Sequence, residues 1–119
     1  MLKFKGSIIV FFNIIFAIIV ISERRLQALE ITVPSSVTIN LNTVSANIPG
    51  SITVSNGSTL QLSSGTITVS NNGNWSNSGT FTPGSSIVQF TGTSHAISGS
   101  STFYNLKCEI PGGTINFEA

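Results

Sequence analysis

Residues 52–71 read ITVSNGSTLQLSSGTITVSN, so the pentapeptide Ile-Thr-Val-Ser-Asn both opens and closes the stretch. An earlier Ile-Thr-Val stands at residues 31–33. Self-similarity of this sort is typical of a solenoid, in which successive coils stack and like residues line up from one coil to the next. The repeat therefore favours a stacked β-structure.

Apolar residues alternate with polar ones in short runs on both sides of this stretch. Gly, Pro and Asn-Gly pairs separate the runs and supply the backbone conformations that turns require. A period of two places every second side chain on the same face of a strand, so one face of each run is expected to be buried. No helical periodicity of useful length follows residue 30, and the pattern predicts an all-β domain. The runs are Ile31-Thr-Val33, Val37-Thr-Ile39-Asn-Leu41, Ile52-Thr-Val54, Leu60-Gln-Leu62, Ile67-Thr-Val69 and Val88-Gln-Phe90.

Two all-β architectures fit this pattern. Asn56-Gly57 between two alternating runs is typical of a type I′ hairpin turn, which favours an antiparallel β-meander or sandwich. The repetition favours a short right-handed parallel β-solenoid, similar to a β-helix. Uncharged Ser, Thr and Asn suit the solenoid, because a stacked column of like charges would repel while hydroxyls and amides can bond from coil to coil. We prefer the solenoid and keep the antiparallel fold as the alternative.

The chain has no Asp, Glu, Lys or Arg from Ile31 to Leu106. Acid–base catalysis and hard-metal binding draw mostly on ionisable side chains, so we expect no catalytic residue, no metal site and no cofactor. His95 is the single histidine of the sequence, with Ser94 beside it. Adjacent residues on a strand point to opposite faces, so we interpret His95 as a solvated turn residue and not as the base of a hydrolase.

The first 28 residues differ in character from the rest. Two lysines precede an apolar run from Ile8 to Ile21, and a more polar segment ends at Ala28. This order is typical of a secretory signal peptide. As a helix the run would reach about 21 Å, which is short against a hydrocarbon core of about 30 Å. We predict cleavage between Ala28 and Leu29, leaving a β-strand domain over residues 29–119; if uncleaved, this segment would be the chain's contact with a membrane.

Removal of this segment would change the charge of the chain. The whole sequence has a formal net charge of +1. The domain left behind keeps Lys107 against Glu30, Glu109 and Glu118, and one positive minus three negative charges gives −2. A basic surface for nucleic acid is therefore not expected. A glycosidase pair of carboxylates is not expected either, because the three glutamates lie at the two extremes of the domain.

The second half of the domain carries a family resemblance. Residues 73–81 read GNWSNSGTF, residues 88–92 read VQFTG, residues 97–99 read ISG and residues 103–106 read FYNL. In order and spacing they resemble the β-strand repeat units of large bacterial secreted and surface proteins, over about residues 70–116. The resemblance implies a β-helix-like, non-enzymatic architecture held by packing between repeats. The residues assigned to this packing are Trp75, Phe81, Val88, Phe90, Ile97, Phe103 and Leu106.

Four other positions have competing interpretations. Cys108 alternates with Leu106, and we interpret it as a small buried hydrophobe ahead of an intermolecular disulfide, although the segment 107–109 departs from the family pattern. Trp75 is assigned to the core ahead of stacking on a sugar. Asn56 and Asn74 each begin an Asn-x-Ser acceptor pattern for glycosylation, which matters only in a eukaryotic secretory route.

These expectations combine into a hypothesis of function. We expect a secreted or cell-surface structural or adhesive module without catalytic activity, whose partner is cell-surface polysaccharide or protein. A solenoid of about four coils has open strand edges at its ends, so end-to-end self-association is also expected. The alternatives are the N-terminal fragment of a β-helix enzyme acting on polysaccharide, and a truncated product with no independent function, because residue 119 comes just after a new strand has begun.

Overall fold

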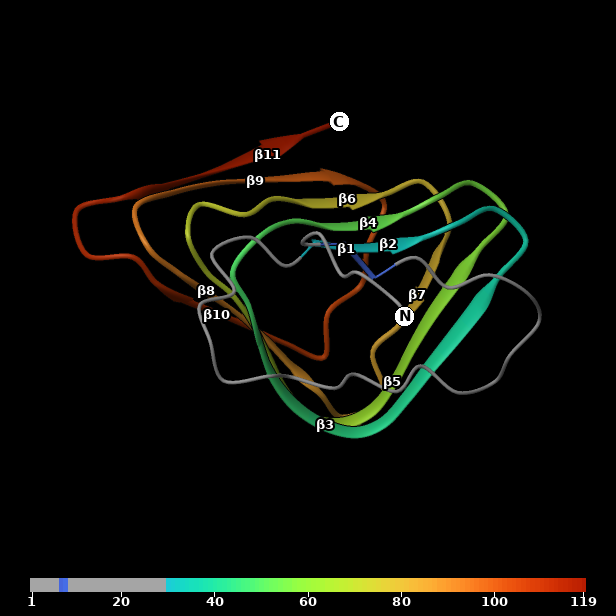
Figure 1. The fold of residues 1–119 in the computed structure, drawn as a ribbon. Helices are drawn as coiled ribbons and strands as arrows, with labels where there is room; N and C mark the ends of the chain where they lie inside the picture. The colour runs from blue at the N-terminus through green and yellow to red at the C-terminus, as the bar shows by residue number, and fades with distance from the viewer. Residues whose placement is uncertain (1–6, 9–29) are drawn as a thin grey trace, which may run out of the picture.

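The computed structural model describes residues 7–8 and 30–119, and the chain there winds into a column of stacked β-coils (Figure 1). The strand pairings between coils are parallel, so the fold is a parallel β-solenoid, as predicted. The strands are β1 (Ser7–Ile8), β2 (Glu30–Val33), β3 (Thr38–Ile48), β4 (Ile52–Val54), β5 (Thr59–Val69), β6 (Trp75–Asn77), β7 (Thr80–Thr82), β8 (Ile87–Thr91), β9 (Ser94–Gly99), β10 (Asn105–Glu109) and β11 (Thr114–Glu118).

The signal peptide predicted from the sequence falls almost wholly outside the described residues. Of that segment the structure describes β1, which pairs in parallel with the start of β2. The predicted cleavage between Ala28 and Leu29 also lies outside the described residues. The continuous part of the described chain begins at Glu30, the first residue of β2.

Three faces enclose the column (Figure 1). Face A is the sheet with strand order β1-β2-β4-β6-β9-β11. The other sheet has the order β10-β8-β5-β3, and β3 and β5 each bend through a corner in their middle. Face B consists of the first parts of these two strands, residues 38–41 and 59–62, with β7 paired to β5. Face C consists of their second parts, residues 45–48 and 66–69, followed by β8 and β10.

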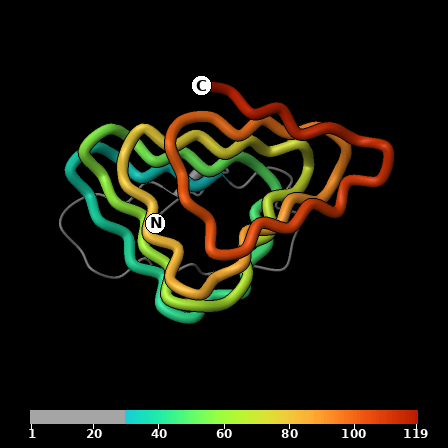
Figure 2. The backbone as a smooth tube through the Cα atoms, turned by 180° about the vertical axis from the view of Figure 1, so that it is seen from behind, coloured from blue at the N-terminus to red at the C-terminus, as the bar shows by residue number. Residues whose placement is uncertain are grey.

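The coil is right-handed, as expected. In the view of Figure 1 the chain runs clockwise from the near coils at its N-terminal side to the far coils at its C-terminal side. The opposite view in Figure 2 places the C-terminal coil nearest the viewer. A right-handed path is the usual connection between parallel strands of one sheet, because it follows from the right-handed twist of the strands.

The pentapeptide repeat does not stack in the way that the sequence suggests. Residues 31–33 do pair with residues 52–54, as like residues on neighbouring coils. The second pentapeptide begins on face C of the same coil, where residues 67–69 pair with residues 46–48 and with residues 88–90. The repeat therefore reflects two faces of one coil that need the same alternation, and it is not the period of the solenoid.

The alternative antiparallel hairpin is wrong. Strands β4 and β5 pair with strands of neighbouring coils and not with each other in a hairpin. The turn between them is closed by a hydrogen bond from Ser58 N to Ser55 O of 3.1 Å, and its positive φ is at Gly57, +74°. A single positive φ at the third position is a type II turn, whereas a type I′ turn needs two. The Asn-Gly pair thus turns the chain from face A to face B.

The inward-facing residues form one core along the column. Burial alternates along the strands, as the period of two predicts. Partly buried Val37, Val44, Ala46, Phe103 and Ile115 pack against this core. Its buried members are Ile31, Val33, Ile39, Leu41, Ile48, Ile52, Val54, Leu60, Leu62, Ile67, Val69, Trp75, Phe81, Val88, Phe90 and Ile97.

Candidate binding surface

Face B presents two parallel columns of polar side chains to the outside. The first column is threonine on three successive coils, Thr38, Thr59 and Thr80, which pair in register. Neighbouring strands lie about 4.8 Å apart, so the three hydroxyl-bearing side chains repeat at that spacing. On each strand the residue that follows the threonine is inward-facing and buried, so the threonine side chain lies on the outer surface. The second column is Asn40, Gln61 and Thr82.

Face A carries a similar but less accessible column. Thr32, Thr53, Ser76 and Ser98 follow one another in register across β2, β4, β6 and β9. All four are only partly exposed, whereas Thr38 and Thr80 at the two ends of the face B column are exposed. Face B is therefore the better-exposed array of regularly spaced hydroxyls and amides.

Polar side chains also bond from one coil to the next, as the uncharged composition predicts. On the outside of face C, Ser70 Oγ donates to Asn47 Oδ1 at 2.8 Å. At the corner between faces B and C, the hydroxyls of Thr43 and Ser64 lie 3.1 Å apart. Stacking like residues therefore leaves hydrogen-bonding groups within reach of their neighbours, without the repulsion that stacked charges would produce.

Asparagine side chains form hydrogen bonds between the third coil and the fourth. Asn72 Oδ1 accepts hydrogen bonds from Thr93 N, Thr93 Oγ1 and Ser94 N, each at 3.1 Å. Asn74 Oδ1 accepts one from Ala96 N at 2.8 Å. Positive φ angles of 52° at Asn71 and 58° at Asn72 hold this corner, in a left-handed conformation that asparagine tolerates better than most residues.

Asn77 is buried, and its side-chain amide makes three hydrogen bonds within the protein. Its Nδ2 donates to Ser100 O at 2.7 Å and to Ser101 Oγ at 3.0 Å. Its Oδ1 accepts from Gly79 N at 3.0 Å. The side chain thus closes the turn after β6 and holds the chain that follows β9, with its amide fully used inside the protein.

Replacing Asn77 by alanine is expected to lower the free energy of unfolding by about 2 kcal/mol or more, because buried hydrogen-bonding groups lose their partners. Asn56→Ala is the matched control, since Asn56 is exposed in a turn, and we expect a change within about 0.5 kcal/mol. Urea unfolding of the full chain followed by circular dichroism measures both. Equal effects of the two substitutions would contradict the role given to Asn77.

Trp75, Phe81 and Phe103 form an aromatic cluster in the core between faces A and B. Trp75 is fully buried, and its ring meets Phe81 edge-on with centroids 4.7 Å apart and Phe103 at 5.2 Å. The indole Nε1 donates to Ser101 Oγ at 3.0 Å. A side chain in this position has no surface to offer a sugar ring. Of the residues assigned to packing, Val88, Phe90 and Ile97 are also buried, and Phe103 is partly buried against the core.

Two of the sequence-based interpretations at the C-terminal end are wrong. Leu106 and Cys108 pair with Val88 and Phe90, so both continue inward-facing columns, yet both are exposed. The reason is their position: β10 is the edge strand of its sheet, and a side chain is covered only when the next coil lies over it. Cys108 is thus an accessible thiol and not a buried hydrophobe.

The interpretation of His95 as a solvated turn residue is also wrong. His95 lies on β9 with 2% of its surface exposed. Nδ1 donates to Gly73 O at 2.6 Å, and the ring meets Phe90 edge-on with centroids 5.1 Å apart. His95 lies two residues before buried Ile97 on the same strand, so alternation turns His95 inward and Ser94 outward. The two residues therefore do not face one another.

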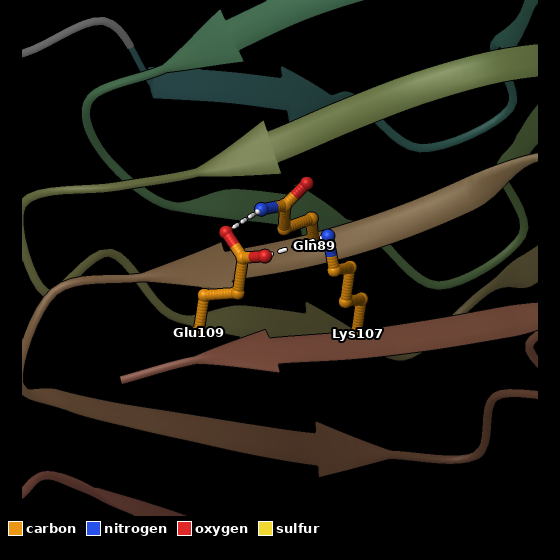
Figure 3. A network of polar contacts seen from close by, with 3 residues as sticks. All are labelled: Gln89, Lys107 and Glu109. Atoms are coloured by element: carbon orange, nitrogen blue, oxygen red, sulfur yellow. Dashed lines mark hydrogen bonds and ion pairs between the residues drawn. The ribbon is translucent and has the colours of Figure 1, made fainter. Parts of the chain in front are cut away.

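The charged residues lie apart from the polar columns of face B. Lys107 Nζ and Glu109 Oε1 form an ion pair of 2.6 Å, and Gln89 Nε2 donates to Glu109 Oε2 at 2.6 Å (Figure 3). Glu30 lies at the start of β2 and Glu118 at the end of β11. Within residues 30–119, no three His, Cys, Asp or Glu side chains come together as a metal site.

Both glycosylation acceptor asparagines, Asn56 and Asn74, are exposed. In the part of the chain that the structure describes, no helix is long and apolar enough to cross a membrane. Comparison with protein-family models, curated proteins and solved structures finds no match to this chain.

Proposed function

We propose that this chain is a structural or adhesive module, secreted or held at a cell surface, that binds neutral polysaccharide through face B and has no catalytic role. The observation that carries the proposal is the in-register column of Thr38, Thr59 and Thr80 beside a second column of amides and hydroxyl. These groups are uncharged, regularly spaced and displayed on hydrogen-bonded parallel strands.

The chemistry of such a surface suits a polymer rich in hydroxyl groups. Each hydrogen bond to a hydroxyl contributes only about 0.5–1.5 kcal/mol net, because it replaces bonds to water. A polymer that touches several coils at once makes many such contacts, and each further contact forms at high effective concentration. Face B offers both donors and acceptors on three coils, so it can bind a repeating ligand better than a single small sugar.

Two sequence observations support the cellular setting of this proposal. The first is the signal-peptide pattern of residues 1–28, which predicts export. The second is the resemblance of residues 70–116 to the β-strand repeat units of bacterial secreted and surface proteins. The stacked parallel coils agree with the architecture that this resemblance implies.

Binding to insoluble polysaccharide tests the proposal. The full chain is mixed with cellulose, chitin or an insoluble β-glucan, and the amount left in solution is measured. The double substitution Thr38→Val and Thr59→Val removes two hydroxyls of face B with little change of shape, and we expect it to weaken binding about tenfold.

The matched control is Thr32→Val with Thr53→Val, which removes two stacked hydroxyls from face A. We expect this variant to bind as the unmodified chain does. Circular dichroism of both variants checks that the fold is retained. Absence of binding to every polymer, or equal binding by the two double variants, would contradict the assignment of face B.

A further inference from the structure

The C-terminal end of the column exposes a complete strand edge. Strand β10 pairs with β8 on one side only and is the edge of its sheet. All five of its residues are exposed, although Leu106 and Cys108 continue columns that are buried one coil earlier at Val88 and Phe90. Unpaired backbone groups next to apolar side chains form a surface on which another strand can pair.

The two charges of this strand are arranged symmetrically about its cysteine. Lys107 precedes Cys108 and Glu109 follows it. Both charged side chains lie on the same face of the strand, where they form their ion pair with 55% and 51% of their side-chain surfaces exposed (Figure 3). A strand with opposite charges on either side of one residue, here Cys108, is complementary to an antiparallel copy of itself that pairs about that residue.

We propose that β10 is the interface with a second copy of this chain, and that the two β10 strands pair antiparallel about a two-fold axis at Cys108. In this arrangement Lys107 of each copy lies opposite Glu109 of the other, and the two Cys108 residues face each other. Leu106 lies opposite Ile110 of the second copy. A two-fold contact of this kind closes on itself and forms a dimer.

The surface next to β10 fits this partner. Leu106 of the second copy, opposite Ile110, would enter a shallow depression at the end of the strand and cover part of its apolar lining. Contact of the two apolar sides would then remove from water the inward-facing residues that the column leaves open. The depression is lined by Thr91, Cys108, Glu109, Ile110 and Pro111.

Head-to-tail stacking is the competing arrangement, and it differs in which charged residues lie across the interface. In that case β10 would pair with β3, the opposite edge of the same sheet, which contains no charged residue. The charged residues of β10 would then face no charged residue of the other copy. The contact would also be repeated from copy to copy along an open filament. The charge of Lys107 therefore distinguishes the two arrangements.

Sedimentation velocity of the full chain over a range of concentrations is the first test. We expect a monomer–dimer equilibrium. Lys107→Glu places two glutamates opposite each other at both ends of the pairing, and we expect dimerisation to weaken about tenfold. The double variant Lys107→Glu with Glu109→Lys restores opposite charges across the two-fold axis, and we expect it to dimerise as the unmodified chain does. Circular dichroism checks that the variants keep the fold.

Cross-linking through the thiol is the second test. Diamide accepts the two electrons and two protons that two thiols release on forming a disulfide, and we expect it to convert the unmodified chain rapidly into a covalent dimer. The control variant, Cys108→Ser with Asn56→Cys, moves an exposed thiol to a turn away from β10, and its cross-linking should be at least tenfold slower at the same concentration.

Three results would overturn the proposal. One is a chain that remains monomeric at every concentration. Another is association that is unchanged by Lys107→Glu or not restored by the double variant, which would point to head-to-tail stacking or to contacts elsewhere. The third is equal cross-linking rates for the thiols at positions 108 and 56. None of these results bears on polysaccharide binding by face B, because β10 belongs to face C.

Discussion

Phe90→Ala is expected to lower the free energy of unfolding by about 3–5 kcal/mol, the usual cost of truncating a fully buried phenylalanine. Phe90 has no exposed surface, and its ring meets His95 edge-on. It stands in an inward-facing column between Val69 on the coil before and Cys108 on the coil after. Truncation would leave a cavity in the core, because β8 is hydrogen-bonded on both sides, to β5 and β10, and cannot move inward freely.

Phe117→Ala is the control for this experiment, because it makes the same chemical change at a residue that is 71% exposed. We expect its effect to stay within about 0.5 kcal/mol. Urea unfolding of the full chain, followed by circular dichroism, measures both variants. The free energy of unfolding of an ordinary domain is about 5–15 kcal/mol, so Phe90→Ala would remove a large part of the stability. Similar effects of the two substitutions would contradict the position of the core.

Gly73→Ala is the second substitution for which we expect a large effect. A Cβ atom at Gly73 would overlap the carbonyl oxygen of Gly50 on the coil before. The carbonyl belongs to the backbone and the position of a Cβ is fixed by the backbone, so neither can rotate away, and the corner between two coils would have to open. We expect a loss of about 3 kcal/mol or more in the free energy of unfolding.

Gly57→Ala separates this close approach from simple backbone strain. Gly57 has a φ of +74°, but a Cβ there would meet nothing within 4 Å. We expect a loss of about 1 kcal/mol, the cost of placing an L-residue in the left-handed region. Thermal unfolding of the two variants compares them directly. A cost for Gly57→Ala equal to that for Gly73→Ala would show that coil-to-coil contact is not what makes glycine necessary at residue 73.

Much of the fold could be predicted because its cause is local. Alternation of apolar and polar residues with a period of two specifies a strand with one buried face, whatever lies next to it. The buried residues of β2, β4, β5 and β8 follow this pattern. The shortage of charges agreed with stacking for a different reason, because side chains such as those of Asn47 and Ser70 bond between coils where charges of one sign would repel.

The candidate site on face B could not be predicted from local sequence patterns. The threonine column of face B depends on the pairing of Thr38 with Thr59 and of Thr59 with Thr80, and each pair is one full coil apart in the chain. The visible repeat of Ile-Thr-Val-Ser-Asn has a shorter spacing and lies within one coil, so it does not reveal this register. The actual register could be found only by knowing where the corners fall.

Local pattern also failed to predict the exposure of three side chains, those of His95, Leu106 and Cys108. His95 lies on β9 in phase with buried Ile97 and therefore faces the core, although its sequence neighbourhood is typical of a turn. Leu106 and Cys108 face inward, yet β10 is the edge of its sheet and leaves them exposed. Short-range pattern was thus enough to specify the alternating runs as strands and, within those runs, which side chains face inward, because these follow from backbone geometry within a few residues. Coil length, the alignment of threonines and the exposure of the last strand depended on the folded column, because they arise from contacts between residues that are far apart in the chain.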